Sequence, residues 1–144
     1  MSVYEELRSH KDIDMRKYDG VCCECLVTSA IDGDTVLIVC KLDDRFEKHC
    51  LRIHGIDTPE IHTRDADEKR RGEESKKALV DLIDKHRGEA RVEFFKDEKY
   101  GRRLGKLFFG DVNVSEYMVE KQFAREFLTR KSAKPVPETK KTTK

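Results

Sequence analysis

The chain has 144 residues, of which 37% are hydrophobic and 41% are charged. This length fits one modest domain, and the charged share is well above the roughly one quarter that is usual. No apolar run approaches the roughly 20 residues that span a bilayer, and the N-terminal stretch MSVYEELRSHKDID lacks a signal-peptide core. The composition therefore argues against a membrane or secreted protein and predicts an intracellular one, cytoplasmic or nuclear.

The net charge of +1 is unevenly distributed along the chain. Residues 131–144 carry five lysines and one glutamate, so the rest of the chain is slightly acidic. A slightly acidic domain of this kind is not a basic module that binds nucleic acid through its overall charge. Any contact with phosphate would depend on a few well-placed groups.

The five cysteines lie in the first 50 residues of the chain, at Cys22, Cys23, Cys25, Cys40 and Cys50. An odd number within strand-like runs does not form a disulfide framework, which again favours a reducing compartment. A zinc site built from Cys22, Cys23, Cys25, His49 and Cys50 lacks the paired C-x-x-C spacing of structural zinc sites. Packing as small hydrophobic residues is the favoured interpretation of these cysteines.

Residues 1–20 are polar and predict an extension with room for a short helix. Runs of β-branched, aromatic and apolar residues predict five strands, at 21–27, 35–40, 46–53, 90–95 and 104–109. A mainly apolar stripe at helical spacing runs from Ser75 to His86 and predicts a helix. Glu73 and Glu74 favour the start of this helix, and Gly88 is the residue expected to end it. Ser115 is the expected N-cap of a shorter helix.

The order β-β-β-α-β-β-α predicts a β-rich α+β fold, an OB-fold five-stranded barrel with two or three packed helices. We expect a polar extension over 1–20, the barrel domain over 21–130 and a disordered basic tail over 131–144.

Three polar clusters interrupt the predicted strands. Asp32-Gly33-Asp34-Thr35 joins two strands, and it also fits an ordinary hairpin turn. The run from Arg52 to Glu60 ends an apolar strand, where Gly55 could bend the chain and bring Arg52 towards Asp57; an exposed ion pair is the alternative. The run from Asp97 to Arg102 also fits a charged hairpin loop.

Taken together, the clusters contain what the hydrolysis of a phosphodiester requires. Asp34 and Asp57 suit a hard cation such as Ca²⁺ or Mg²⁺. Glu60 could act as a general base on water, while Arg52 and Arg102 could bind phosphate and neutralise charge in the transition state. The three clusters therefore predict a metal-dependent phosphodiesterase acting on nucleic acid.

Over about residues 21–130 the chain resembles the staphylococcal (micrococcal) nuclease family. The resemblance rests on five stretches in the family's order: IDGDT at 31–35, RIHGIDTPE at 52–60, RGEESKKAL at 71–79, KYGRRLG at 99–105 and VSEYMVEKQFA at 114–124. It implies an OB-fold barrel in which Asp34, Asp57 and the Thr58 carbonyl hold Ca²⁺, with Mg²⁺ as an alternative. Asp32 would lie in the surroundings of these ligands.

The resemblance also implies roles for the other site residues. Glu60 would contact the attacking water, Arg52 and Arg102 the scissile phosphate, and Lys99 and Tyr100 a terminal phosphate. The expected substrates are single-stranded DNA, RNA and duplex DNA, cut to leave 3′-phosphate ends by a monomeric enzyme. The alternative function is a catalytically inactive module of the same family that binds nucleic acid or protein.

Two features depart from the family pattern. Leu128 stands where a base-stacking tyrosine is often found, so stacking would be weaker or would fall to Phe127. Gln122 replaces a glycine that often ends the second helix, so a left-handed conformation there would be strained.

Overall fold

The computed structural model describes residues 2–13, 17–96 and 102–127. Its strands are β1 (Cys22–Asp32), β2 (Thr35–Leu42), β3 (Arg45–Ile53), β4 (Ile56–Asp57), β5 (Glu89–Phe94), β6 (Arg103–Phe109), β7 (Val112–Asn113) and β8 (Arg125–Glu126). Its helices are α1 (Val3–Ser9), α2 (Ala66–Lys85) and α3 (Val114–Glu120). The tail predicted at 131–144 lies outside the described residues.

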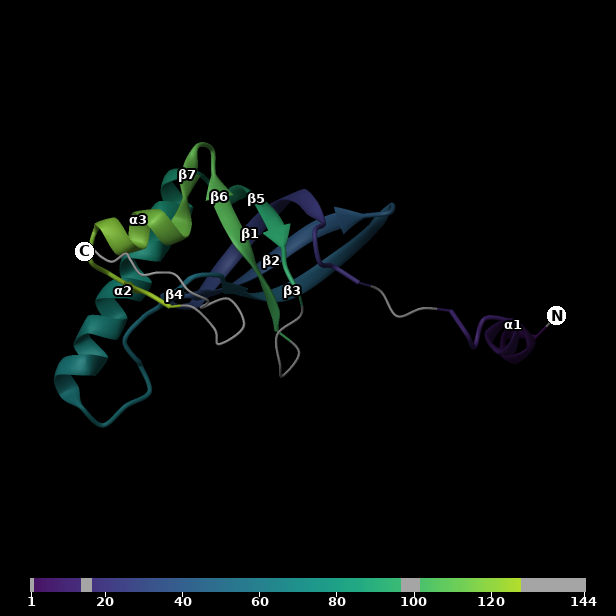
Figure 1. Ribbon diagram of the computed structural model, residues 1–144, viewed down its shortest axis with the longest axis horizontal. Coiled ribbons are helices and arrows are strands. Elements are labelled where there is room, and N and C mark those ends of the chain that lie inside the picture. Colours follow the sequence, from purple (N-terminus) through teal and green to yellow (C-terminus); the bar gives the residue numbers. More distant parts are fainter. Residues whose placement is uncertain (1, 14–16, 97–101, 128–144) are drawn as a thin grey trace, which may run out of the picture.

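Five strands close into a barrel (Figure 1). Antiparallel pairings join them in the order β3-β2-β1-β5-β6, and β6 then pairs with β3 in parallel. In this closing pair Leu51 lies opposite Arg103 and Ile53 lies opposite Gly105. The predicted OB-fold barrel, with its order of long strands and helices, is confirmed.

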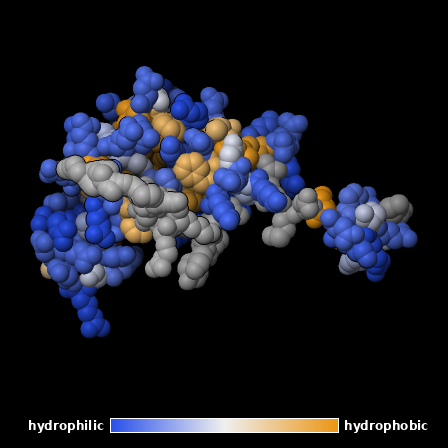
Figure 2. Space-filling model, in the orientation of Figure 1, coloured by the Kyte–Doolittle hydropathy of each residue, from blue (hydrophilic) through white to orange (hydrophobic). Residues whose placement is uncertain are grey.

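The core lies inside the barrel and beneath the two C-terminal helices. Alternate residues of the strands point inward, as strand geometry requires, and the largest buried side chains include those of Phe94, Phe109, Ile38, Leu51 and Ile53. Figure 2 shows that hydrophilic residues dominate the visible face, with apolar residues gathered over the barrel. Among the described residues, the buried polar side chains are Asp34, Thr35 and Ser75.

Helix α2 begins earlier than the sequence pattern predicts. Its N-cap is Asp65, whose carboxylate accepts hydrogen bonds from the amides of Asp67 and Glu68 at 3.0 and 3.1 Å. The predicted position of Glu73 and Glu74 at the helix start is therefore wrong, because they lie in its middle. The apolar stripe is confirmed, and the buried residues of α2 are Gly72, Ser75, Leu79, Leu82 and Ile83. Gly88 follows the helix with a φ of 75°.

Helix α3 also begins at a different residue. Asn113 is its N-cap and accepts a hydrogen bond from the Glu116 amide at 3.2 Å, so the prediction of Ser115 is wrong. The Ser115 hydroxyl instead donates to the carbonyl of His54 at 2.6 Å and ties α3 to the bend after β3. After the helix, Gln122 has a φ of 66°, the left-handed conformation expected to be strained there.

Among the described residues before β1, Tyr18 belongs to the core. Helix α1 buries none of its side chains and lies apart from the barrel in Figure 1. Tyr18, in contrast, is 7% exposed, and its ring centroid lies 5.5 Å from that of Phe94. None of the helices in the described residues has the length and apolar character that a membrane span requires.

Candidate active site

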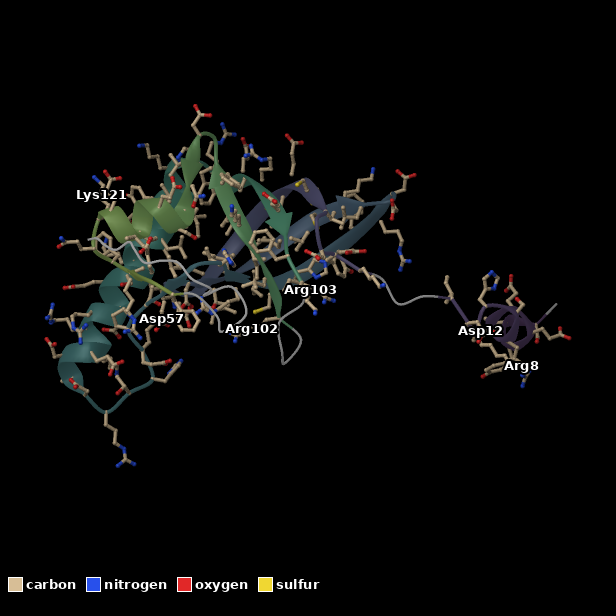
Figure 3. All side chains as sticks on the ribbon, in the orientation of Figure 1. Arg8, Asp12, Asp57, Arg102, Arg103 and Lys121 are labelled. Carbon is tan, nitrogen blue, oxygen red and sulfur yellow. The ribbon has the colours of Figure 1, made fainter. Side chains whose placement is uncertain are left out.

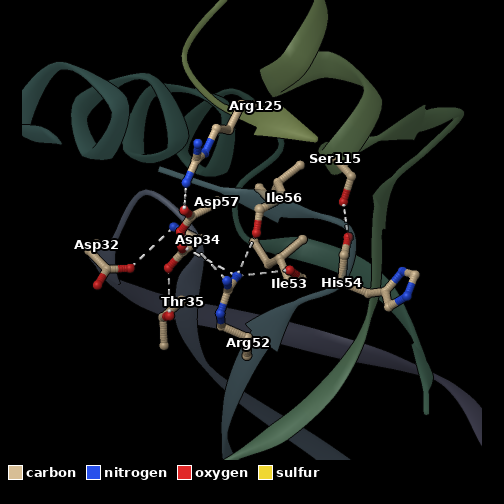
Figure 4. A network of polar contacts seen from close by, with 10 residues as sticks. All are labelled: Asp32, Asp34, Thr35, Arg52, Ile53, His54, Ile56, Asp57, Ser115 and Arg125. Carbon is tan, nitrogen blue, oxygen red and sulfur yellow. Dashed lines mark hydrogen bonds and ion pairs between the residues drawn. The ribbon is translucent and has the colours of Figure 1, made fainter. Parts of the chain in front are cut away.

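Arg52 links two carboxylates at one end of the barrel (Figure 4). One guanidinium nitrogen lies 3.3 Å from Asp34 Oδ2 and donates to the carbonyls of Ile53 and Ile56 at 3.2 and 2.9 Å. Its other terminal nitrogen lies 3.8 Å from Asp57 Oδ1. Since 11% of the Arg52 side chain is exposed, this network is largely shielded from water. Asp34, Arg52 and Asp57 are thus together, as the sequence predicts.

The turn between β1 and β2 holds Asp34 in a buried position. The Asp34 amide donates to Asp32 Oδ1 at 3.2 Å, and the Thr35 hydroxyl donates to Asp34 Oδ1 at 2.9 Å. Burial raises the pKa of Asp34 from 3.8 to about 6; the nearby Asp32 adds to the rise and Arg52 opposes it. A buried carboxylate with a raised pKa is stabilised by added positive charge, as a bound cation would supply.

Gly33 lets this turn approach its neighbours closely. A Cβ atom at this position would lie 2.8 Å from Ser75 Cβ on α2 and 3.0 Å from Thr58 Cγ2. Its φ is not positive, so close packing is the role of this glycine. The packing places the Asp34 turn beside Thr58, the third expected metal ligand.

Gly55 bends the chain between Arg52 and Asp57. Its φ of 90° falls in the left-handed region, which confirms the predicted bend. Beyond the bend, β4 pairs with β8, with Asp57 opposite Arg125. Arg125 donates to Asp57 Oδ2 at 3.0 Å. Arg125 could not be predicted from the sequence as a partner of Asp57, because it reaches Asp57 only through the return of the chain after α3.

Glu60 stands at the edge of this network. Its side chain is exposed, and its amide donates to Glu68 Oε2 on α2 at 3.2 Å. Gly72 brings the helix against this segment, since a Cβ there would lie 2.7 Å from the Pro59 carbonyl oxygen and 2.9 Å from that of Glu60. Gly72 lies before the helix predicted from the sequence, so this contact became apparent only when the structure extended α2 back to Ala66.

Arg102 immediately precedes β6. Since Leu104 pairs with Arg52 in the parallel ladder, alternation along the strand directs Arg102 to the outer side of the barrel that Arg52 occupies. Arg102 is half-buried, and Figure 3 shows it at the start of β6. Lys99 and Tyr100 lie outside the described residues.

A polar cleft adjoins the carboxylates. It is lined by Asp57, Thr58, Pro59, Glu68, Arg71, Gln122, Phe123, Ala124 and Arg125. On the other side of Arg52, its guanidinium carbon lies 5.9 Å from the centroid of the Phe127 ring, which is 42% exposed. The amide of Phe127 donates to the Gly55 carbonyl at 2.9 Å and so fixes this ring near the bend. An exposed aromatic ring therefore stands beside the cationic centre.

The donors gathered here fit a hard divalent cation. Asp34 and Asp57 supply carboxylate oxygens on two sides of one arginine, and Thr58 packs beside them. Ca²⁺ and Mg²⁺ prefer such oxygen ligands, whereas sulfur or imidazole donors would favour zinc. The pairing with Arg52 and Arg125 balances the two carboxylate charges in the described arrangement.

The fold and this site define a five-stranded OB-like barrel with an acidic pair and a buried arginine at one end. Residues 50–143 match the family described as staphylococcal nuclease homologue, and this range covers more than half of the 144-residue chain. The chain belongs to this nuclease-type family. The match includes Arg52, Asp57, Glu60 and Arg102, while Asp34 precedes it. Comparison with curated proteins found no match.

Proposed function

We propose that this protein is a metal-dependent nuclease that hydrolyses the phosphodiester bonds of DNA and RNA. The observation that carries the proposal is the convergence of Asp34 and Asp57 on Arg52, at 3.3 and 3.8 Å, within a barrel of the nuclease family. A barrel that served only as a scaffold would have no need for two partly buried carboxylates beside a buried arginine, because such groups are expensive to desolvate.

Asp34, Asp57 and the carbonyl of Thr58 would hold the metal, Ca²⁺ in the first instance and Mg²⁺ as the alternative. When bound, the ion would supply charge neutralisation and polarisation of the phosphate. Asp32 supports this set by accepting the hydrogen bond from the Asp34 amide. The raised pKa of Asp34 makes its carboxylate ready to exchange a proton for a cation.

The reaction itself needs three further side chains. Glu60, exposed at the edge of the network, would take a proton from the attacking water as its oxygen bonds to phosphorus. Arg52 and Arg102 would donate hydrogen bonds to the non-bridging oxygens, on which charge gathers. The bond from phosphorus to the 5′ oxygen would break, and the departing oxygen would take a proton from solvent water, which leaves a 3′-phosphate end and a 5′ hydroxyl.

The substrate would lie over Arg52 and the adjacent cleft. Phe127 could stack on a base, which is typically worth about 1–3 kcal/mol, and its exposed ring beside Arg52 supports this role. Arg71 and Arg125 line the cleft and could contact neighbouring phosphates. Lys99 and Tyr100 would bind a terminal phosphate. These contacts would be made to phosphate, to sugar and to the face of any base. The expected substrates are therefore single-stranded DNA and RNA, and duplex DNA is a further candidate. We expect the enzyme to be a monomer that acts inside the cell.

The test is cleavage of single-stranded DNA, RNA and duplex DNA by the purified full chain with Ca²⁺, with Mg²⁺ or with a chelator. We expect cleavage with Ca²⁺, its loss with chelator, and 3′-phosphate ends identified by mass spectrometry. Glu60→Gln and Arg102→Ala should each lower the rate by about 10²–10³-fold. The matched controls are Glu73→Gln and Arg45→Ala, which change exposed residues elsewhere and should leave the rate unaltered.

Two results would overturn the proposal. One is cleavage that persists unchanged in both Glu60→Gln and Arg102→Ala, which would point to a contaminating enzyme. The other is a folded wild-type chain that binds and shifts the substrate with any metal but never shortens it, which would assign the protein to the inactive binding modules.

A further inference from the structure

A second group of metal-binding side chains lies at the opposite end of β2 and β3. Cys40 on β2 is directly opposite Glu47 on β3, and His49 is two residues further along β3 on the same face. One ligand atom from each of these three residues lies within 4.8 Å of the others. Tetrahedral zinc has ligand bonds of about 2.0–2.3 Å. The three ligand atoms would therefore need to move only slightly closer together to bind one ion.

The neighbouring strand contributes a second thiol. Cys25 on β1 is directly opposite Cys40, and Cys23 precedes it by two residues, so both point to the same face. The Cys23 thiol makes a side-chain hydrogen bond with Cys40 and interacts electrostatically with Glu47, so it adjoins the group of three without belonging to the set whose ligand atoms all lie within 4.8 Å of one another. We propose that Cys23, Cys40, Glu47 and His49 form a zinc-binding site that joins β1, β2 and β3 at this end of the barrel.

The donor set suits zinc. Two sulfurs, one imidazole nitrogen and one carboxylate oxygen fill four positions, and zinc accepts all three donor types. The His49 and Glu47 side chains are 10% and 17% exposed, so the site is largely closed, as structural zinc sites are, yet it can be reached from solvent. Calcium and magnesium, which take oxygen ligands, would not be held here.

The surroundings hold these side chains in position. His49 Nε2 lies 2.9 Å from Glu47 Oε1, and the Tyr18 hydroxyl donates to the same carboxylate at 3.1 Å. The Tyr18 and His49 rings meet edge to face with centroids 5.0 Å apart. Hydrogen bonds from outside the ligand set commonly orient metal ligands. Tyr18 takes this part here.

The charges can also be balanced. Zinc with two thiolates and one carboxylate has a net charge of −1, and the Arg103 guanidinium lies 4.3 Å from the centroid of the Tyr18 ring beside the site. Burial raises the pKa of the Cys23 thiol, so zinc would displace a proton from this thiol on binding.

The structure revises which residues belong to such a site. Cys22 is exposed, and Cys50 points to the face of β3 opposite that of Glu47 and His49, so the set of five considered from the sequence does not meet at one point. The spacing C-x-x-C suits the tight turns of zinc knuckles, whereas neighbouring strands supply ligands at alternate positions. The E-x-H pair formed by Glu47 and His49 has that alternation.

The experiment is a titration of the reduced, metal-free full chain with Zn²⁺ by calorimetry, and with Co²⁺ by absorption spectroscopy. We expect one Zn²⁺ per chain, a higher Tm with Zn²⁺ and a near-ultraviolet thiolate-to-cobalt band. Cys40→Ser, His49→Gln, Cys23→Ser and Glu47→Gln should each weaken binding by at least about tenfold. Cys22→Ser and His10→Gln are the matched controls, because these exposed residues lie outside the site.

Zn²⁺ affinity is measured without a nucleic-acid substrate, so this test is independent of the proposed nuclease activity. Binding should be unchanged in Asp57→Asn, which alters the other end of the barrel. If the Cys40→Ser chain fails to fold, Zn²⁺ binding by Cys23→Ser and Glu47→Gln, which change partly exposed residues, decides the test. The proposal is overturned if wild type binds no Zn²⁺, or if binding survives unchanged in the ligand variants that fold.

Discussion

The two ends of the barrel are built in different ways. At the end that holds Arg52, the side chains come from the β1–β2 turn, the end of β3, β4 and β8, and they meet because loops and helices pack together. At the end that holds His49, they come from three adjacent strands and meet through the register of the sheet. Along β2, Thr35 and Cys40 are separated by roughly 17 Å, from a rise of about 3.3 Å per residue.

The chemistry of the two ends differs as well. Asp34 and Asp57 are carboxylates balanced by arginines, an environment suited to a hard cation and to phosphate. Cys40, Glu47 and His49 combine sulfur, oxygen and nitrogen, which suits zinc. One small barrel can therefore carry a reactive site and a stabilising site, provided that the two select different ions. Substitutions can show whether the ends are as independent as this comparison implies.

The largest effect is expected from Arg52→Ala. Asp34 and Asp57 would then face each other without their shared cation, so we expect the free energy of unfolding to fall by about 3 kcal/mol and cleavage to fall by about 10²–10³-fold. Urea unfolding and the nuclease assay measure the two effects. Tyr18→Phe at the other end is the comparison; it should lower stability by about 1 kcal/mol and leave cleavage unchanged. Equal activity losses in both variants would show that the ends are coupled.

The next effect concerns how α2 positions Glu60. Gly72→Ala places a methyl group 2.7 Å from the Pro59 carbonyl oxygen, a backbone atom that cannot rotate away. We expect a loss of about 1–2 kcal/mol, measured by urea unfolding, together with slower cleavage as Glu60 moves. The control is Glu73→Ala on the exposed side of the helix, which should change stability by no more than about 0.5 kcal/mol. A stabilised Gly72→Ala chain would contradict the close contact.

The third effect is a pH dependence specific to the Asp34 end. Because its pKa is about 6 in the folded chain and 3.8 as a free side chain, the folded state binds the proton more tightly. The metal-free protein should therefore lose stability as pH rises from about 4 to about 6, and this contribution should level off above that range. Urea midpoints measured with chelator across this range should show a wild-type slope that Asp34→Asn lacks. Identical slopes in the wild type and in Asp34→Asn would disprove the assignment of this pH dependence to Asp34.

The smallest effect concerns the segment after α3 that returns to Asp57. Gln122 has a φ of 66°, which glycine adopts without strain, so Gln122→Gly should stabilise the chain by about 1 kcal/mol. Thermal unfolding measures the gain. Gln122→Ala keeps the Cβ atom and should give no such gain, which separates backbone strain from the loss of the side chain.

Much of this could be predicted from the sequence because it depends on local patterns. The alternation of the five long strands, the stripe of α2 and the bend at Gly55 follow from side-chain periodicity and backbone freedom. The start of α2 was misplaced because Asp65, rather than the Glu73–Glu74 pair, caps the helix. The α3 cap was misplaced because Ser115 bonds to a carbonyl distant in sequence.

The chain by itself determined the residue types: the acidic pair and arginines, the cysteines and the E-x-H pair, and the glycines at 33, 55 and 72. Only the tertiary structure decided the partners. Arg125 reaches Asp57 across 68 positions of sequence, and Cys40 meets Glu47 through strand register. The physical reason is that ion pairs and ligand sets depend on distances of a few ångströms, which local preferences leave open until the barrel closes and α2 packs against the Pro59–Glu60 segment.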